Sequence, residues 1–330
     1  MLGQLVFDLD DVKILDEIGD GTFGKVFLVE DKNTKTKYAA KVNKTNCAKT
    51  IEQKTFMTEI DIFSKVKYPS ILQLIGYNLH NFNSEPYPTV ITEYMANGSL
   101  ETIIDRENNG DLPIEWSDTS KYIVLLGISL GMNYLHLNNI THRDLKPANI
   151  LIDERFYPRI CDFGLSKNTE EQLKKASMES TVGTPFYMAP EILLRHKYTY
   201  KVDVYSFALI AIEMITSKRS PIDIGLISGK ENQEFFEKCL SPDPEERPDF
   251  SQICELLTSS TFTSIFNNLD YDEVECYLDE FETDPEALLV HGLLLANNKS
   301  EKDKETIANY YKTSADKGNS TAMFNYALML

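Results

Sequence analysis

The chain of 330 residues has few cysteines, a deficit of basic residues and no long apolar run. Its five cysteines are scattered and odd in number, and they show neither paired spacing nor nearby histidines suited to zinc. This pattern argues against a disulfide framework or a zinc site and favours reduced thiols in the cytoplasm. The 33 basic residues stand against 51 acidic ones, and the net charge of −18 argues against general binding of nucleic acid or anionic membranes.

Targeting and membrane-spanning segments are not expected either. The N-terminal residues MLGQLVFDLDDVKIL lack the basic start and the continuous apolar stretch of a secretory signal, and Asp8, Asp10 and Asp11 interrupt them. The longest weakly charged run, residues 122–137, is shorter than the roughly 20 apolar residues that a membrane helix requires. We therefore predict that this run is a buried core helix and that the chain has no transmembrane segment.

Apolar periodicity and the placement of glycine predict a small β-rich part followed by a larger helical one. Short strands separated by glycines and a charged turn are typical of an antiparallel sheet. Apolar residues at helical spacing predict a helix over residues 51–67, which Pro69 ends. Two further strands follow, and the chain is then mostly helical to about Leu257. The strands are expected over residues 12–18, 26–30, 38–42, 71–77 and 89–93.

An acidic stretch and a weak internal repeat mark the C-terminal part. Residues 270–286 contain nine acids and no lysine or arginine, which predicts a solvated linker or a helix face. Residues 285–295 then align with residues 320–330 at an offset of 35, and Ala287 matches Ala322. This offset is close to the period of helix-turn-helix solenoid units, in which small residues let helices approach each other closely.

Two short motifs bring several chemically active side chains together. In ITHRDLKPANIL, which ends at Leu151, Asp144 is followed by Lys146 and Asn149, so one loop can present a proton acceptor, a cation and a metal ligand. Asp162, in the sequence Asp-Phe-Gly, arrives on a separate turn and can complete a metal site with Asn149. This combination indicates phosphoryl transfer.

A glycine-rich turn in the β-rich part suits the same chemistry. Gly19, Gly21 and Gly24, followed by Val26, fit a loop whose backbone N–H groups can close over phosphate oxygens. Dinucleotide-binding folds use a similar spacing, but there a helix opens at the third glycine. A strand follows here instead, which favours a phosphate-covering hairpin.

Lys41 is the candidate cation of the β-rich part, because it ends an apolar strand where it can hold phosphate groups. Glu59, in the helix that follows, can pair with Lys41 and fix its ammonium group. Glu52 is the competing acid, but the apolar neighbours of Glu59 are those expected of a helix packed against a sheet.

Together these motifs resemble those of the protein kinase superfamily, over residues from about 11 to 257. The resemblance implies a bilobal α+β fold with ATP and Mg²⁺ as cofactors and proteins as substrates. It implies that Asp144 orients the substrate hydroxyl, that Lys146 stabilises the transferred phosphoryl group, and that Asn149 and Asp162 ligate Mg²⁺. The catalytic residues it implies are Asp144, Lys146, Asn149, Asp162 and Lys41.

Further positions are similar to the ATP-binding residues of protein kinases. Thr92, Glu93 and Met95 resemble a hinge with a threonine gatekeeper, where backbone groups would bond adenine. The residues implied to bind ATP are Ile18, Gly19, Gly21, Gly24, Val26, Ala39, Lys41, Glu59, Thr92, Glu93, Met95 and Leu151.

Two positions favour serine and threonine as acceptors. Lys146 stands two residues after Asp144, and Thr184 precedes the sequence Ala-Pro-Glu, as in Ser/Thr-directed kinases. The hinge and residues 203–207 resemble the tyrosine-kinase-like group of Ser/Thr kinases. A tyrosine or dual-specificity kinase, and a catalytically silent kinase-fold scaffold that signals by binding alone, are the alternatives.

Arg143, beside Asp144, implies regulation, because in kinases with this arginine a phosphate on the activation segment commonly pairs with it. The candidate acceptors are Ser177, Ser180 and Thr181, although hydroxyls are also common in solvated loops.

The segment between Asp203 and Arg247 is shorter than is usual in the family. Residues 217–231 are predicted to be a loop that passes directly into a helix over residues 231–240. Arg247 is expected to pair with Glu191, the acid of Ala-Pro-Glu.

Residues 305–319 resemble the signature of Sel-like repeats, which are related to tetratricopeptide repeats, with Gly318 ending a helix. The resemblance implies an α-helical solenoid fragment that binds protein partners, and an ordinary helical extension is the alternative. The expected domains are an N-terminal extension (1–10), a protein kinase domain (11–260), an acidic linker (261–284) and truncated Sel-like repeats (285–330).

Overall fold

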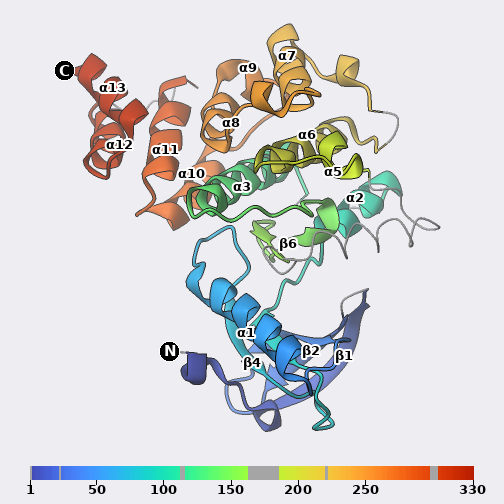
Figure 1. Ribbon diagram of the computed structural model, residues 1–330. Helices are drawn as coiled ribbons and strands as arrows, with labels where there is room; N and C mark the ends of the chain where they lie inside the picture. The colour runs from blue at the N-terminus through green and yellow to red at the C-terminus, as the bar shows by residue number, and fades with distance from the viewer. Residues whose placement is uncertain (1, 22–23, 112–115, 163–185, 220–221, 298–303) are drawn as a thin grey trace. The chain divides into compact units, whose positions relative to one another are not determined.

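The computed structural model describes residues 2–21, 24–111, 116–162, 186–219, 222–297 and 304–330. They form two compact units, which Figure 1 shows in ribbon form. The sheet unit comprises residues 1–67 and 71–97, and the helical unit comprises residues 68–70 and 98–330. A small β-rich part followed by a larger helical one is the order expected from the sequence.

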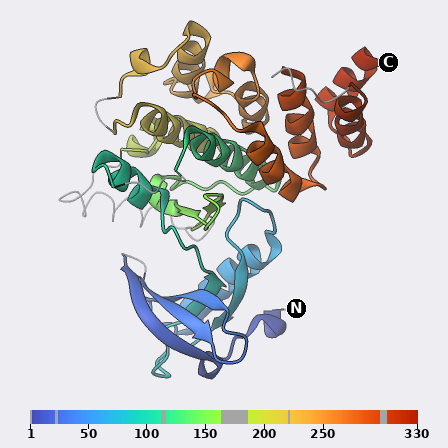
Figure 2. The same cartoon turned by 180° about the vertical axis from the view of Figure 1, so that it is seen from behind.

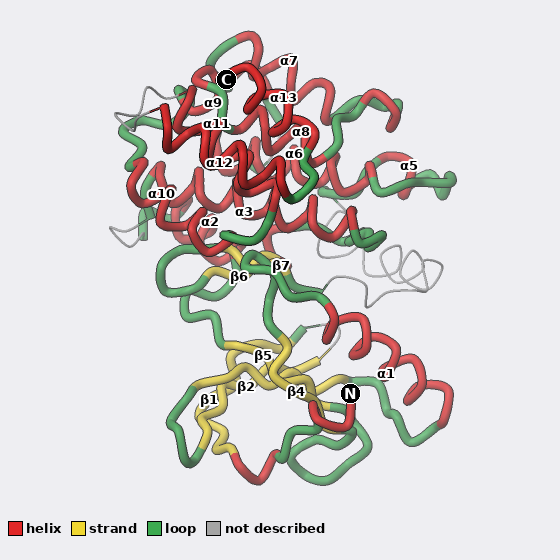
Figure 3. The backbone as a smooth tube through the Cα atoms, turned by 90° about the vertical axis from the view of Figure 1, so that its left-hand side faces the viewer, coloured by secondary structure: helices red, strands yellow, loops and turns green. Residues whose placement is uncertain are grey.

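The sheet unit is built on a five-stranded antiparallel sheet with strand order β1-β2-β3-β5-β4. Val29, Ala40 and Ile91 are fully buried at its centre. Helix α1 lies beside the sheet (Figure 3). It packs there through Phe56, whose ring meets that of Tyr77 edge to face with ring centroids 6.0 Å apart. The elements are β1 (Val12–Asp20), β2 (Gly24–Asp31), β3 (Lys37–Asn43), α1 (Thr50–Lys65), β4 (Leu74–Asn78) and β5 (Thr89–Glu93), preceded by η1 (Leu2–Leu5) and η2 (Leu9–Asp11).

Several strand boundaries differ from the expected ones, by up to three residues. Strand β1 continues past Ile18 to Asp20, because Gly19 pairs with Val26 and Asp20 with Lys25 across a β-bulge. Strand β4 begins at Leu74 and not at residue 71, since its pairing with β5 starts at Leu74, opposite Thr92. Short-range periodicity carries no information on such long-range pairing.

The helical unit is centred on α3 (Asp118–Leu137), and nearly all residues of this helix are buried. A helix that is apolar on all sides must be covered on all sides, which confirms the buried core helix predicted over residues 122–137. None of the helices in the described ranges is long and apolar enough to cross a membrane. Among the described residues, the other elements up to residue 263 are α2 (Leu100–Asn108), η3 (Pro147–Asn149), β6 (Ile150–Ile152), β7 (Pro158–Ile160), α5 (Pro190–Leu193), α6 (Lys201–Thr216), η4 (Ile224–Leu226), α7 (Lys230–Cys239), η5 (Pro244–Glu246), α8 (Phe250–Leu257) and α9 (Ser260–Thr263).

The predicted pair of Glu191 and Arg247 is confirmed. The two guanidinium Nη atoms of Arg247 donate to the two carboxylate oxygens of Glu191 at 2.6 and 3.0 Å. Arg247 also donates to the backbone oxygens of Ser241 and Lys201. A buried ion pair in which every guanidinium nitrogen donates a hydrogen bond ties α5 to the turn before α8.

The connection between α6 and α7 is short, as predicted. Its described residues contain η4 and no α-helix, and α7 begins one residue earlier than expected. Arg219 donates from Nε to Glu213 Oε1 at 2.8 Å, and the hydroxyl of Tyr187 also donates to Glu213. The fully buried Glu213 therefore joins this connection to the segment that precedes α5.

The acidic stretch after residue 269 is folded. It forms α10 (Tyr271–Leu278) and η6 (Asp279–Phe281) and buries Val274, Tyr277 and Phe281. Of the two sequence interpretations, a helix face describes these residues and a solvated linker does not, because sparse apolar side chains at helical spacing are enough to anchor a charged helix.

Three helices follow and pack in sequence, α11 (Pro285–Asn297) against α12 (Lys304–Asp316) and α12 against α13 (Ser320–Met329), as Figure 1 and Figure 2 both show. Leu289, Tyr311 and Ala322 form their core. A Cβ atom at Gly292 would lie 2.7 Å from the Tyr311 ring, so glycine permits this close approach.

Candidate active site

The glycine-rich turn of the sheet unit has the backbone geometry expected of a tight hairpin. The N–H of Gly21 donates to the carbonyl oxygen of Gly24 at 3.0 Å. A Cβ atom on Gly24 would lie 2.3 Å from the Val42 carbonyl oxygen, so no other residue fits there without moving the backbone. Thr22 and Phe23, at the tip, lie outside the described residues.

Lys41 and Glu59 come from two elements of the same unit. Lys41 lies on β3, opposite Val26 of β2 and Val90 of β5. Glu59 lies on α1. Burial raises the pKa of the nearby Cys47, and the carboxylates of Glu52 and Glu59 raise it further. Both candidate acids are therefore close to one buried thiol.

The hinge candidates lie at the end of β5. Thr92, which pairs with Ala39 of β3, is buried, and so is Met95. The Glu93 carboxylate accepts a hydrogen bond from the backbone N–H of Gln73 at 2.8 Å. This bond fixes the Glu93 side chain against β4, so only its backbone groups are suited to a ligand.

The loop over residues 144–149 gathers three predicted catalytic side chains. Lys146 Nζ donates to Asp144 Oδ2 at 2.8 Å. The amide nitrogen of Asn149 donates to the same oxygen at 3.0 Å and to the Asp144 carbonyl oxygen at 2.6 Å. The carboxylate of Asp144 is therefore held by two donors, and the loop presents an acid, a cation and an amide together.

Asp203, at the start of α6, holds this loop by accepting hydrogen bonds from its backbone. Its fully buried carboxylate accepts hydrogen bonds from the backbone N–H groups of His142 and Arg143, both at 2.8 Å, and lies 2.8 Å from His136 Nε2. Arg143 has a φ of 70°, a left-handed conformation that a non-glycine residue adopts only under local constraint. Asp203 supplies that constraint.

Sequence reasoning placed Asp203 only at the start of a helix and missed this role. A signal was present, because Asp203 and Glu213 are the acids of an otherwise apolar helix. A carboxylate that must be buried needs donors, and the unpaired backbone N–H groups of a tight loop are suitable ones.

His142 joins the loop to the segment that carries Asp162. Its Nδ1 accepts from the backbone N–H of Asp144 at 3.3 Å, which places a proton on Nε2, 3.0 Å from the Cys161 carbonyl oxygen. The Cys161 N–H in turn donates to the Asn149 carbonyl oxygen at 2.9 Å. These bonds bring Asn149 and the residue before Asp162 to the same end of the β6–β7 hairpin.

The two predicted metal ligands suit a hard cation. The amide nitrogen of Asn149 is used as a donor to Asp144, so its carbonyl oxygen is the atom suited to a metal, and Asp162 offers a carboxylate. Mg²⁺ takes oxygen ligands and commonly uses one or two protein groups together with phosphate oxygens and water. No cluster of three or more His, Cys, Asp or Glu side chains suited to a metal occurs among the described residues.

For the remaining predicted site residues, the structure gives only their strand position or does not describe them. Leu151 lies on β6, paired with Arg159 and bridged to Ser99, and Ile18 is exposed on β1. The activation-segment residues Ser177, Ser180, Thr181 and Thr184, and Phe163 and Gly164 of Asp-Phe-Gly, lie outside the described residues.

The comparisons with known proteins agree with this geometry. Residues 12–223 match the protein kinase domain. The chain is 31% identical over 268 residues to serine/threonine-protein kinase STY17 of Arabidopsis thaliana, covering 76% of this chain and 45% of that protein. It is 31% identical over 272 residues to the probable serine/threonine-protein kinase drkB of Dictyostelium discoideum, covering 76% of this chain and 37% of that protein.

The chain thus spans less than half the length of these relatives. The domain match covers more than half of the chain and contains every predicted catalytic and ATP-binding residue. The chain therefore belongs to the protein kinase family, as shown by the domain match together with the β-rich and helical lobes and the order of the motifs.

Proposed function

We propose that this chain is an ATP-dependent protein serine/threonine kinase of the tyrosine-kinase-like group. The observation that carries the proposal is the hydrogen-bonded set of Asp144, Lys146 and Asn149 on a loop held by the buried Asp203. The substrate hydroxyl oxygen would attack the γ-phosphorus of ATP as the bond to the bridging oxygen of ADP breaks, and Asp144 would accept the hydroxyl proton.

The remaining roles are assigned to residues of both lobes. Lys146 would neutralise charge on the moving phosphoryl group, and Lys41, paired with Glu59, would hold the α- and β-phosphates. The backbone of the turn between Gly19 and Gly24 would cover the phosphates, and the hinge at Glu93 and Met95 would bond adenine. The other ATP contacts are proposed at Ile18, Val26, Ala39, Thr92 and Leu151.

Asn149 and Asp162 would hold Mg²⁺, which when bound would neutralise the negative charge of the phosphate groups. Two observations support this assignment. Both residues offer oxygen ligands, and the β6–β7 hairpin joins them. The hydrogen bonds from Asn149 to Asp144 orient the amide before any ligand arrives.

Serine and threonine are proposed as acceptors on two grounds. Lys146 stands at the position that favours them, and the similar proteins STY17 and drkB carry serine/threonine-protein kinase in their names. We also propose that a phosphate on Ser177, Ser180 or Thr181 would pair with Arg143 and order the activation segment. All five cysteines are free thiols, which supports a cytoplasmic location.

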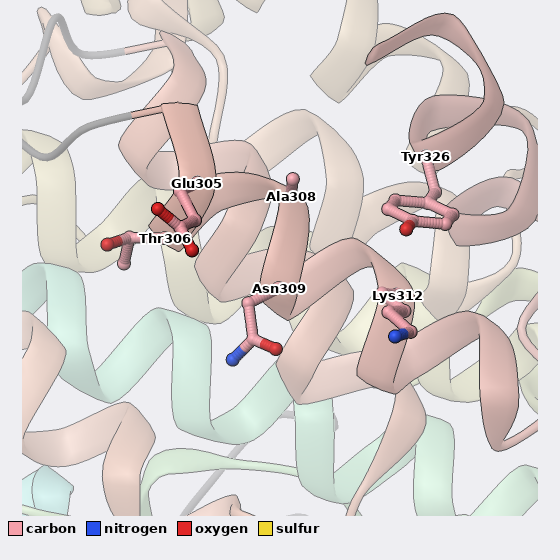
Figure 4. A pocket seen from close by; sticks show the side chains of 6 residues that line it. All are labelled: Glu305, Thr306, Ala308, Asn309, Lys312 and Tyr326. Atoms are coloured by element: carbon pink, nitrogen blue, oxygen red, sulfur yellow. The ribbon is translucent and has the colours of Figure 1, made fainter. Parts of the chain in front are cut away.

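The C-terminal helices are proposed to be Sel-like repeats that bind a protein partner. Their support is the pairwise packing of α11, α12 and α13 and the small residue Gly292 at the α11–α12 contact. An open pocket of about 480 Å³ lies on these helices, and Figure 4 shows the side chains that line it. Glu305, Asn309 and Lys312 of α12 and Tyr326 of α13 offer polar groups there.

A phosphotransfer assay tests the proposed function. The full chain, with labelled ATP, Mg²⁺ and a generic protein substrate, is expected to label serine and threonine. Asp144→Asn keeps the shape of the side chain but removes the proton acceptor, so incorporation should fall at least about a hundredfold. Asp111→Asn, at an exposed acid of the same unit, is the matched control and should keep the wild-type rate.

Three results would contradict the proposal in different ways. Unchanged incorporation by Asp144→Asn would reject Asp144 as the catalytic acid. Labelled phosphotyrosine would indicate a tyrosine or dual-specificity kinase. No incorporation by the wild type, with its activation segment phosphorylated or not, would favour a silent scaffold.

A further inference from the structure

The connection that leaves α1 is held by the helical unit. Tyr68 follows the end of α1 after two residues, and its ring stacks on Tyr134 of α3 with ring centroids 4.4 Å apart. Two residues later, the carbonyl oxygen of Ser70 accepts a hydrogen bond from the N–H of Ile160 at 2.8 Å. The fully buried Ser70 also lies against α3, because a Cβ atom on Gly131 would be 2.6 Å from its hydroxyl.

The segment after the catalytic lobe reaches the same connection. The ring of Phe281, in η6, meets the Tyr68 ring edge to face at 5.2 Å. Burial raises the pKa of Tyr68, and the nearby carboxylate of Asp284 raises it further. The Asp284 carboxylate also caps the start of α11 by accepting from the Ala287 N–H at 2.7 Å. Tyr68 is thus enclosed by α3 on one side and by η6 and Asp284 on the other.

This C-terminal segment is itself fastened to the catalytic lobe. Glu280 pairs with Arg155 and lies 3.8 Å from Arg159, and both arginines belong to the β6–β7 hairpin and its turn. At the other end of the segment, the Asn267 N–H donates to the Asp118 carboxylate at 2.8 Å, and the Asp270 N–H donates to Thr119 at 2.9 Å. Attachment at both ends leaves η6 little freedom to move away from Tyr68.

We propose that Phe281 and Asp284 are positioning residues that clamp Tyr68 and thereby restrict α1, the helix that carries Glu59. The inference rests on the proposed function, in which Glu59 must hold Lys41 against the phosphates of ATP. Because the clamped connection is the covalent continuation of α1, ordering it limits the positions that α1 can take. A loss of order there would misplace the Lys41–Glu59 pair, and small misplacements of this kind are costly to the rate.

The test uses the full chain with two variants and one control. Phe281→Ala removes one wall around Tyr68, and Tyr68→Phe keeps the ring and removes only the hydroxyl group near Asp284. Leu289→Ala is the matched control, because it truncates a fully buried side chain that packs on Tyr311 and Ala322 and not on Tyr68. Hydrogen exchange of residues 51–73 and the kinetics of phosphotransfer are measured for each.

Phe281→Ala should speed amide exchange in the connection and in α1 and lower kcat/KM by about tenfold. Tyr68→Phe should change both in the same direction by about two- to fivefold, since it keeps the ring contacts and loses only one polar group. Leu289→Ala should leave both at wild-type values while loosening α11 to α13. If Phe281→Ala does not fold, Tyr68→Phe carries the test.

Each other outcome overturns a distinct statement. Unchanged exchange over residues 51–73 in both variants rejects the clamp. Faster exchange with unchanged kcat and KM rejects the positioning role. If the wild type transfers no phosphate, the proposed function fails, and the exchange of α1 alone then decides whether the clamp restricts it.

Discussion

At the scale of single residues, Asp203 is the side chain that holds the catalytic loop in place. Its carboxylate collects two backbone N–H groups and one imidazole nitrogen. Hydrogen bonds to a charged acceptor are worth about 1.5–3 kcal/mol each, which is enough to hold Arg143 in its left-handed conformation.

Asp203→Asn should therefore lower both rate and stability. One of its two oxygens becomes an NH₂ group that faces a backbone donor, so we expect a loss of about 2 kcal/mol in the free energy of unfolding and at least a tenfold lower kcat. Chemical denaturation and phosphotransfer assays measure the two effects. Asp249→Asn, which breaks the pair with Lys201 on the same helix but leaves the loop untouched, should lower stability alone. Equal kcat values for both variants would argue against the role given to Asp203.

Glu286 predicts a pH dependence of stability. Burial, together with the carboxylates of Glu255 and Asp284, raises the pKa of Glu286 from 4.5 to about 7. Between these values the folded state holds a proton that the unfolded state has released, so the free energy of unfolding contributed by this group falls as the pH rises from 4.5 to 7.

Glu286→Gln mimics the protonated side chain at every pH. It should match the wild type in free energy of unfolding at pH 4 and exceed it at pH 8, by on the order of 1–3 kcal/mol. Denaturant titrations at both pH values measure the difference. Glu282→Gln, at an exposed acid of the same segment, should show no such change between the two pH values. A pH-independent effect of Glu286→Gln would contradict the prediction.

At the scale of elements, the contact between α3 and α10 depends on one missing side chain. A Cβ atom on Gly127 would lie 2.1 Å from the hydroxyl oxygen of Tyr277 and 2.5 Å from Cγ of Pro158. That hydroxyl is buried and has no hydrogen-bond partner among the described residues. Helices α3 and α10 therefore approach each other closely, but the buried hydroxyl at their contact makes no hydrogen bond within the described part of the chain.

Gly127→Ala should destabilise the protein although alanine favours helix formation. The propensity gain is about 1 kcal/mol, whereas overpacking of a filled core commonly costs about 1–3 kcal/mol, so we expect a net loss. In a Tyr277→Phe background the clash with the hydroxyl is gone and the cost should shrink. Thermal unfolding of the four proteins of this cycle tests the coupling, and equal costs in both backgrounds would show that the hydroxyl is not responsible.

The success of sequence reasoning differs between elements. Strands β2 and β3, helix α1 and the pair of Glu191 with Arg247 follow from local pattern or motif spacing and were predictable. The burial of α10 was harder to foresee, because its sequence is dominated by acids and its anchors Val274, Tyr277 and Phe281 are few. What decides its packing is the complementary surface of α3, and no local window of the sequence contains that surface.

The candidate site shows the same division. Motif spacing sufficed to select Asp144, Lys146 and Asn149, and the structure places all three in one hydrogen-bonded set. It did not suffice for Asp203, which lies 59 residues after Asp144 in the chain and meets the loop only through the fold. Long-range hydrogen bonds of this kind leave no periodic trace.

At the scale of the whole molecule, the C-terminal segment is part of the helical unit and not an addition to it. We therefore expect that a truncation after Asn267, which removes α10 to α13, exposes the covered face of α3 and of Tyr68. Loss of each of the buried side chains Tyr277, Leu278 and Phe281 would lower the free energy of unfolding by about 1.5–3 kcal/mol.

A truncation after Asn297 is the matched control. It removes α12 and α13 but keeps α10, η6 and α11, so its loss of stability should be markedly smaller. The melting temperatures of the two truncated chains, compared with the full chain, measure this. A similar melting temperature for the full chain and for the chain ending at Asn267 would show that the catalytic lobe does not depend on the segment.

If the protein partners proposed for the C-terminal helices include substrates, the junction at Glu280 has a consequence for substrate choice. Paired with Arg155 and close to Arg159, it gives the helices beyond it a fixed attachment, where a flexible tether would let them sample many distances. For a rigid attachment, the effective concentration of a docked substrate is high only where its acceptor hydroxyl happens to fall, and it drops to nearly zero elsewhere. The choice among docked proteins would then depend less on their docking affinity than on the distance between the docking segment and the acceptor residue of each protein.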